Sequence, residues 1–125
     1  MREKLRVFLT RAGGNGEDED YALEHALAII GFREFPSLEG ADDYEAVVQR
    51  VTEAKQDLKP RAAGNYAGQL WAFAVDMQEG DIVVLPRKLT SQIALGKVTG
   101  PYQYRKEAGS FRHTRPVNRL QRQAH

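Results

Sequence analysis

The sequence predicts a mixed α+β fold in which about three helices flank a small curled or barrel-like sheet of about five or six strands. Two observations favour it. Helical patterns occur in the first two thirds of the chain, and a strand-rich run with short turns follows from Ile82 onward. With 125 residues, 42% of them hydrophobic, the chain can bury one core. We expect a single domain over residues 1–120 and a frayed tail over residues 121–125.

The first third of the chain alternates strands and loops around one helix. Leu5–Leu9 is short, apolar and rich in strand-forming residues, so it predicts a first strand. The glycine-rich segment Arg11–Gly16 follows as a loop. Glu17–Ala26 is predicted to be helical, because its leading acids suit the positive end of a helix dipole. The compact apolar segment Leu27–Phe32 indicates a buried strand, and residues 33–41 a loop.

Two further helices are predicted in the middle of the chain. Asp42 or Asp43 can cap a helix that runs to about Asp57 with an apolar stripe along one face. Pro60 ends that helix. Ala62–Met77 is the next helix, with one apolar face and one polar stripe.

The last third is predicted to be mostly strand. Ile82–Leu85 is uniformly apolar, which is typical of a strand covered on both faces. Gln92–Val98 is a second strand, in which Gly96 indicates a bulge or a close approach of two backbones. Tyr102–Arg105 can extend the ladder, and Phe111–Val117 is the last strand.

Composition excludes several classes of protein. The chain contains no cysteine, so a disulfide framework and cysteine-based metal sites are excluded. No apolar run approaches the ~18 residues of a membrane span, and the N-terminus is too short and too charged for a signal peptide. We therefore expect a soluble cytoplasmic protein.

The net charge of +1 conceals a strong asymmetry along the chain. Residues 12–58 hold 12 acidic and 3 basic side chains, a net −9, whereas residues 86–125 hold 9 basic and 1 acidic, a net +8. A basic C-terminal third is the expected footprint of contact with a polyanion. The alternative is a solvated strand face with a loose basic tail.

The glycine-rich loop Gly13–Gly16 lies between a predicted strand and a predicted helix. Such loops can offer backbone N–H groups to a ligand, but no Gly-Lys-Ser/Thr follows and the dinucleotide spacing is absent. The four acids after the loop would repel a phosphate, so a neutral base edge is the better ligand. A tight turn that requires positive φ is the structural alternative.

The sequence contains little evidence for catalysis or metal binding. The carboxylates of Glu17–Asp20 diverge by about 100° per residue on a helix, which favours a solvated helix start over an ion site. Glu53 and Lys55 match the letters of a nuclease motif but diverge on an amphipathic helix. The three histidines show no metal-ligand spacing. We predict no catalytic residue, no metal and no cofactor.

The second predicted middle helix carries amides and the single tryptophan. Asn65 and Gln69 lie one turn apart and point the same way, so their amides together can read the edge of a base. Trp71 borders the apolar stripe and can stack on a base or join the core. The alternative for the two amides is capping of the helix start or of a loop carbonyl.

The ordered set of motifs in residues 61–102 resembles the EVE branch of the PUA-like superfamily, which is related to YTH domains. The residues that carry the resemblance are Asn65-Tyr66, Leu70, Gly80-Asp81-Ile-Val-Val-Leu, Ile93-Ala-Leu-Gly-Lys-Val and Pro101-Tyr102. The segments that begin at Val7 and Arg115 resemble EVE-like modules at the N-termini of restriction proteins. The resemblance then covers nearly the whole chain. It departs from the family at Thr10–Gly13, where EVE proteins commonly carry aromatic or serine-containing segments.

The resemblance implies a PUA-like barrel whose pocket accepts one flipped, often modified, nucleobase. Matching positions and the residue chemistry give as base-pocket candidates Arg11, Gly13, Asn15, Asn65, Gln69 and Trp71. The basic groups expected to contact a nucleic-acid backbone are Arg87, Lys88, Arg105, Arg112 and Arg115. Among the restriction-linked relatives a separate nuclease domain cuts, so a nuclease in cis or in trans is an implied partner.

The leading hypothesis is therefore a non-catalytic reader that binds a flipped, modified base in DNA, as the recognition domain of a modification-dependent restriction system. A reader of a modified RNA base keeps the fold and changes the partner. A protein-interaction module that uses the acidic half is a third hypothesis, and a small hydrolase or transferase at the glycine loop is the last. The reader hypothesis requires that the Thr10–Gly16 loop and the Asn65 helix meet in space.

Overall fold

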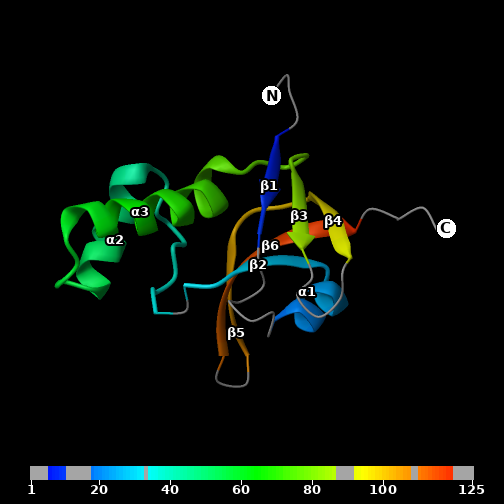
Figure 1. Cartoon of the computed structure of the whole chain (residues 1–125), viewed down its shortest axis with the longest axis horizontal. Coiled ribbons are helices and arrows are strands. Elements are labelled where there is room, and N and C mark those ends of the chain that lie inside the picture. The colour runs from blue at the N-terminus through cyan, green and yellow to red at the C-terminus, as the bar shows by residue number, and fades with distance from the viewer. Residues whose placement is uncertain (1–5, 11–17, 33, 87–91, 108–109, 120–125) are drawn as a thin grey trace.

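The computed structural model describes residues 6–10, 18–32, 34–86, 92–107 and 110–119. Within them, six strands form one mixed sheet, which three α-helices and a π-helical turn accompany (Figure 1). The predicted α+β fold class is confirmed. The elements are β1 (Val7–Leu9), α1 (Glu19–His25), β2 (Leu27–Ile30), α2 (Tyr44–Ala54), α3 (Pro60–Trp71), η1 (Ala72–Asp76), β3 (Ile82–Pro86), β4 (Ile93–Val98), β5 (Gln103–Glu107) and β6 (Ser110–Arg119).

Strand β6 is the centre of the sheet. It pairs with β2 along one edge and with β4 and β5 in succession along the other, always antiparallel. β3 pairs antiparallel with β4, and β1 adds to β3 in parallel. β1 and β2 end the ladder without pairing to each other, so the described strands form an open sheet. The sheet is curled but does not close, and this corrects the barrel-like alternative of the sequence analysis.

The β4–β5 edge contains an irregularity that bends it. Val98 pairs with Val117 and Gln103 pairs with Thr114, so one strand advances five residues while the other advances three. The two additional residues are accommodated around Gly100, where an added Cβ would approach the neighbouring strand to 2.9 Å. Two unmatched residues on one strand bend it locally.

Gly96 allows β4 to lie close to its neighbours, as the sequence analysis predicted. An added Cβ at this position would lie 3.0 Å from Val117 Cβ and 3.4 Å from Val83 Cγ2. Gly96 itself pairs with both Val83 and Arg119. The absence of a side chain at Gly96 therefore lets Val117 and Val83 pack close to the β4 backbone.

The helices begin and end near the predicted residues, with two differences. Asp43 caps α2 as expected, because its carboxylate accepts the Ala46 N–H at 2.8 Å. Pro60 does not end the preceding helix, because α2 already ends at Ala54; Pro60 is the first residue of α3, where its missing N–H has no cost. At the other end, Met77 N–H donates to Ala72 O at 2.9 Å, a wider turn that converts the last residues of the predicted helix into η1.

The core has a helical part and a sheet part. Figure 1 shows α2 and α3 side by side at one end of the molecule, and α1 beside the sheet at the other. Buried residues of the helical part are Phe35, Leu38, Ala41, Val47, Val51, Ala63, Ala67 and Leu70. Buried residues under the sheet include Ala28, Phe73, Met77, Val83 and Val98. None of the helices in the described part of the chain has the length and apolar character needed to cross a bilayer.

Candidate functional site

A pocket lies where the end of β1 meets the junction of α3 and η1. Its volume is about 170 Å³, below the ~300 Å³ at which pockets for drug-sized ligands begin, so it suits a single ring system. The residues that line it are Phe8, Leu9, Thr10, Ile30, Phe32, Gln69, Ala72, Phe73 and Met77. We call this the β1–α3 pocket. Two segments that lie about sixty residues apart in the sequence thus share one cavity.

Three phenylalanines supply apolar walls, and two residues supply polar groups. Thr10 is 4% exposed, and its backbone N–H donates to Val84 O at 2.9 Å, which fixes the end of β1. Gln69 is exposed on α3, and its amide makes no hydrogen bond with a described residue. A free amide can both donate and accept, so a ligand in the pocket can be recognised by its edge as well as by its ring.

The floor of the β1–α3 pocket is held by a buried arginine from β6. Arg115 is 3% exposed, and its Nη1 donates to Phe73 O at 2.9 Å and to Met77 O at 2.8 Å. Its Nε donates to Gly100 O at 3.0 Å. Burial lowers the pKa of the Arg115 guanidinium, partly offset by the Asp81 carboxylate. The guanidinium satisfies carbonyls that the π-helical turn leaves free, and so fixes the turn that presents Phe73 and Met77.

Arg115 was predicted to contact a nucleic-acid backbone, and its burial corrects that prediction. A fully enclosed guanidinium with three carbonyl acceptors cannot also face a phosphate. The sequence contained a signal for this burial. Alternate residues of a strand face the same side, so a basic residue that alternates with inward-facing apolar residues also points inward.

Arg112 is also committed to internal contacts. Its Nε donates to Asp18 Oδ1 at 3.2 Å, and its guanidinium carbon lies 3.9 Å from the centre of the Tyr21 ring. Arg105 lies over the same ring at 6.0 Å. These contacts join β5 and β6 to the start of α1. Two of the cations that were expected to contact a nucleic-acid backbone therefore interact with the protein itself.

The structure brings only part of the predicted base site together. Gln69 lines the β1–α3 pocket, whereas Asn65 is exposed one turn earlier on α3 and is not among the lining residues. Trp71 lies about 200° around the helix from Gln69 and packs edge-on against Tyr44, with ring centres 6.2 Å apart. Outside the described residues are Arg11, Gly13, Asn15, Arg87 and Lys88.

A buried hydrogen-bonded chain connects the sheet to the helical part of the core. The Leu38 N–H donates to Tyr102 Oη at 3.1 Å, and Tyr102 Oη lies 2.6 Å from His113 Nδ1. His113 Nε2 lies 3.1 Å from Phe32 O, which can only accept, so Nε2 carries the proton and Nδ1 accepts from Tyr102. Burial lowers the pKa of His113 and raises that of Tyr102. His113 is thus held as a neutral structural residue.

A larger cavity near this chain suits a polyanion poorly. Its volume is about 330 Å³, and its walls include Tyr102, Glu39 and Asp42. Glu39 Oε2 accepts the Tyr104 N–H at 3.3 Å. Two carboxylates at the wall repel phosphates, so the β1–α3 pocket is the better candidate for a nucleic-acid ligand.

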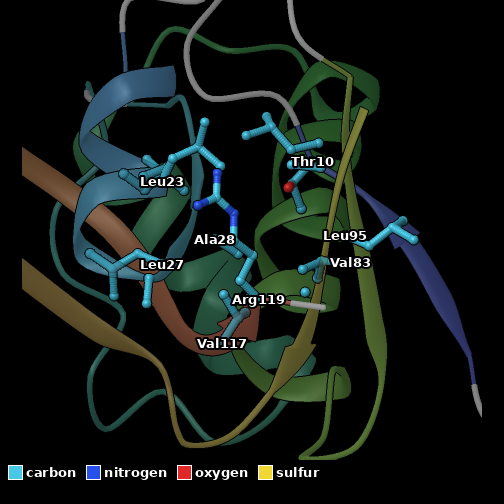
Figure 2. Close-up of a pocket in the computed structure, with 14 residues that line it drawn as sticks. Thr10, Leu23, Leu27, Ala28, Val83, Leu95, Val117 and Arg119 are labelled. Atoms are coloured by element: carbon cyan, nitrogen blue, oxygen red, sulfur yellow. The ribbon is translucent and has the colours of Figure 1, made fainter. Parts of the chain in front are cut away.

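A narrow cleft lies in the open seam of the sheet, between the α1–β2 segment and strands β3 and β4 (Figure 2). Its volume is about 30 Å³ and its walls are mostly apolar, with Leu23 and Leu27 on one side. Thr10 lines both this cleft and the β1–α3 pocket, so the two cavities adjoin. Arg119 from the end of β6 extends into the cleft (Figure 2). We call this the seam cleft.

Arg119 was not among the predicted site residues. Its guanidinium makes no hydrogen bond or ion pair with a described residue, unlike those of Arg112 and Arg115. No local pattern in the sequence signalled Arg119, because the groups that approach Gly96, its partner across the sheet, are the side chains of Val117 and Val83.

A comparison with protein-family profiles matches residues 6–125 to a family described as a domain of unknown function (DUF8426). The chain belongs to this family. No curated protein matches the sequence, and no solved structure matches the fold. The DUF8426 match spans every described element, from β1 through β6.

Proposed function

We propose that this DUF8426 protein is a nucleic-acid reader that binds one flipped, modified DNA base in the β1–α3 pocket, without catalysis of its own. The observation that carries the proposal is that Thr10 and Gln69 line one aromatic-walled cavity. The reader hypothesis required the Thr10–Gly16 loop and the helix that carries Asn65 to meet, and Thr10 is the residue of that loop that the structure describes. The resemblance to EVE domains supplies the expectation that the ligand is a base.

The chemistry of the pocket favours a nucleobase over other small rings. Phe8 and Phe32 offer aromatic surface for contact with a flat ring, which is worth ~1–3 kcal/mol per stacked base. The Gln69 amide and the Thr10 hydroxyl can each donate and accept, as base edges require. Because the pocket is small, an added methyl or hydroxymethyl group changes its filling appreciably, and this is a physical basis for sensing a modification.

The remaining positive charge supports contact with a polyanion. Exposed cations on the described part of the sheet include Lys106 on β5 and Arg119 on β6. They lie on the strands that carry the basic excess of the sequence. A nuclease partner, in cis or in trans, follows from the resemblance and belongs to this proposal.

The test is a binding panel with matched DNA and RNA oligonucleotides. Each carries N6-methyladenine, 5-methylcytosine, 5-hydroxymethylcytosine, its glucosylated form, or no modification. We expect one modified DNA to bind more tightly than its unmodified control. Gln69→Ala and Thr10→Val, which keeps the shape of the side chain, should each reduce that preference by about 5- to 100-fold, the range for one base-edge contact.

Gln56→Ala removes an exposed glutamine away from the pocket and is the control. Equal loss on modified and unmodified DNA for Gln69→Ala would refute recognition in this pocket. A preference for the modified RNA would replace the DNA claim with an RNA reader. Absence of nucleic-acid binding by the wild-type protein would refute the proposed function altogether.

A further inference from the structure

Arg119 combines three properties that no other described arginine has together. Its side chain is exposed at the mouth of a cleft, it has no partner among the described residues, and no acidic side chain is among the described residues that line the cleft. By contrast, Arg6 donates to the Asp76 carboxylate at 2.7 Å, and Arg115 is enclosed. Among the described residues that line the cleft, none carries a negative charge that compensates Arg119.

The seam cleft gives this charge a defined place. Arg119 pairs with Gly96 on β4, and both residues line the cleft. Figure 2 shows the guanidinium directed toward the part of the cleft that Leu23 and Thr10 line. Apolar walls strengthen the attraction between a guanidinium and an anion, because they lower the local dielectric constant.

The chemistry of the site selects the class of ligand. A guanidinium presents parallel N–H donors that match two oxygens of a phosphate or carboxylate. The cleft of about 30 Å³ is too small for the body of a ligand, so only a compact anionic group at its mouth fits. Because Thr10 lines both cavities, this group lies beside any ligand in the β1–α3 pocket.

We propose that Arg119 at the mouth of the seam cleft is a phosphate subsite, which binds the phosphodiester next to the nucleotide whose base enters the β1–α3 pocket. This inference rests on the proposed function for the source of the phosphate. It assigns the anchoring of the backbone to Arg119 rather than to Arg112 or Arg115. Free inorganic phosphate offers the same chemistry, and the experiment separates the two sources.

The first arm uses the modified DNA from the panel that the wild-type protein binds most tightly. Arg119→Gln should weaken binding to this DNA and to its unmodified control alike, by about tenfold, as expected for one charge-assisted phosphate contact. The slope of log K against log salt should decrease by about 0.9. Binding of the free modified nucleoside, which has no phosphate, should be unchanged.

Lys97→Gln is the matched control, because Lys97 is an exposed cation one register step from Arg119 but on the opposite face of the sheet. It should change DNA affinity less than Arg119→Gln. Equal effects of the two substitutions would overturn the subsite, since they would indicate only nonspecific charge. Loss of nucleoside binding in Arg119→Gln would also overturn it, because the residue would then act on the base.

The second arm titrates inorganic phosphate at low ionic strength while the arginine Nε–H signals are followed by NMR. We expect a saturating shift of the Arg119 signal that persists in Lys97→Gln. If the wild-type protein binds no oligonucleotide, the proposed function fails and this arm decides the subsite. A saturating shift then supports a site for free phosphate, and no shift overturns the inference.

Discussion

Replacement of Arg115 by methionine is expected to destabilise the protein strongly, although the residue looks like a surface cation in the sequence. The substitution keeps an unbranched chain in place but removes all three hydrogen bonds, to Gly100 O, Phe73 O and Met77 O. Each bond to a charged donor contributes ~1.5–3 kcal/mol. Relief from burying a guanidinium offsets several kcal/mol of that sum. We expect a net loss of about 3 kcal/mol in the free energy of unfolding.

The assay is urea unfolding followed by the fluorescence of Trp71, the single tryptophan, which is partly buried against Tyr44. A loss of this size lowers the melting temperature by about 10 °C in a domain of this length. Hydrogen exchange of the Met77 amide, which bonds to Ala72 O, should accelerate more than exchange within α2. Arg115→Lys retains the charge but not the planar fork, so an intermediate loss is expected.

Arg119→Met is the matched control, because it makes the same substitution in the same strand at an exposed side chain that has no partner among the described residues. Its free energy of unfolding should stay within ~0.5 kcal/mol of the wild type. If Arg115→Met and Arg119→Met unfold at the same urea concentration, Arg115 does not hold η1 and the reasoning fails.

Two further predictions concern the sheet. Because the folded-state pKa of His113 is lowered, its contribution to stability is full above the unfolded pKa of about 6.5 and is lost as the pH falls below that value, by at most ~1.4 kcal/mol per pH unit. His113→Gln should reduce the slope of the unfolding free energy against pH between about pH 6.5 and 5, relative to the wild type. An unchanged slope would exclude His113 as the source of this pH dependence. Gly96→Ala places a Cβ 3.0 Å from Val117, so it should destabilise by ~1–3 kcal/mol in the same urea assay. Gly68→Ala, on α3 with no atom near the added Cβ, is the control and should not be destabilised.

The elements of the fold were largely predictable, because local patterns determine them. The acid Asp43 before an apolar stripe predicted α2, and Gly96 predicted the close contact of β4 with its neighbours. The sequence could not predict the pairing of β1 with β3 or the open seam, because these depend on contacts between distant segments. The π-helical turn η1 was also missed, since it depends on a guanidinium from β6, 42 residues away at its contact with Phe73.

The candidate site was less predictable than the fold. Helical spacing identified Gln69, but the same spacing grouped it with Asn65, which does not line the pocket. The rule that basic residues face solvent does not distinguish Arg112, Arg115 and Arg119, which occupy one strand. The first stacks on Tyr21 and pairs with Asp18, the second is enclosed, and the third lies in a cleft without a partner among the described residues. Contacts with distant parts of the chain decide among these outcomes, and no local pattern specifies them.

β6 follows all the other described elements in the sequence, and this order affects how they fold during synthesis. Three of the five strand pairings use β6, including that of residues 27–30 with residues 113–116. The α2–α3 pair is complete by residue 71, so it can pack early on the ribosome. The backbone N–H and C=O groups of β2 and of the outer edge of β4 stay unpaired until β6 leaves the ribosome. During that time these strands can associate with other nascent chains. Folding of the sheet is thus a late event, which the final ten residues of the described chain complete.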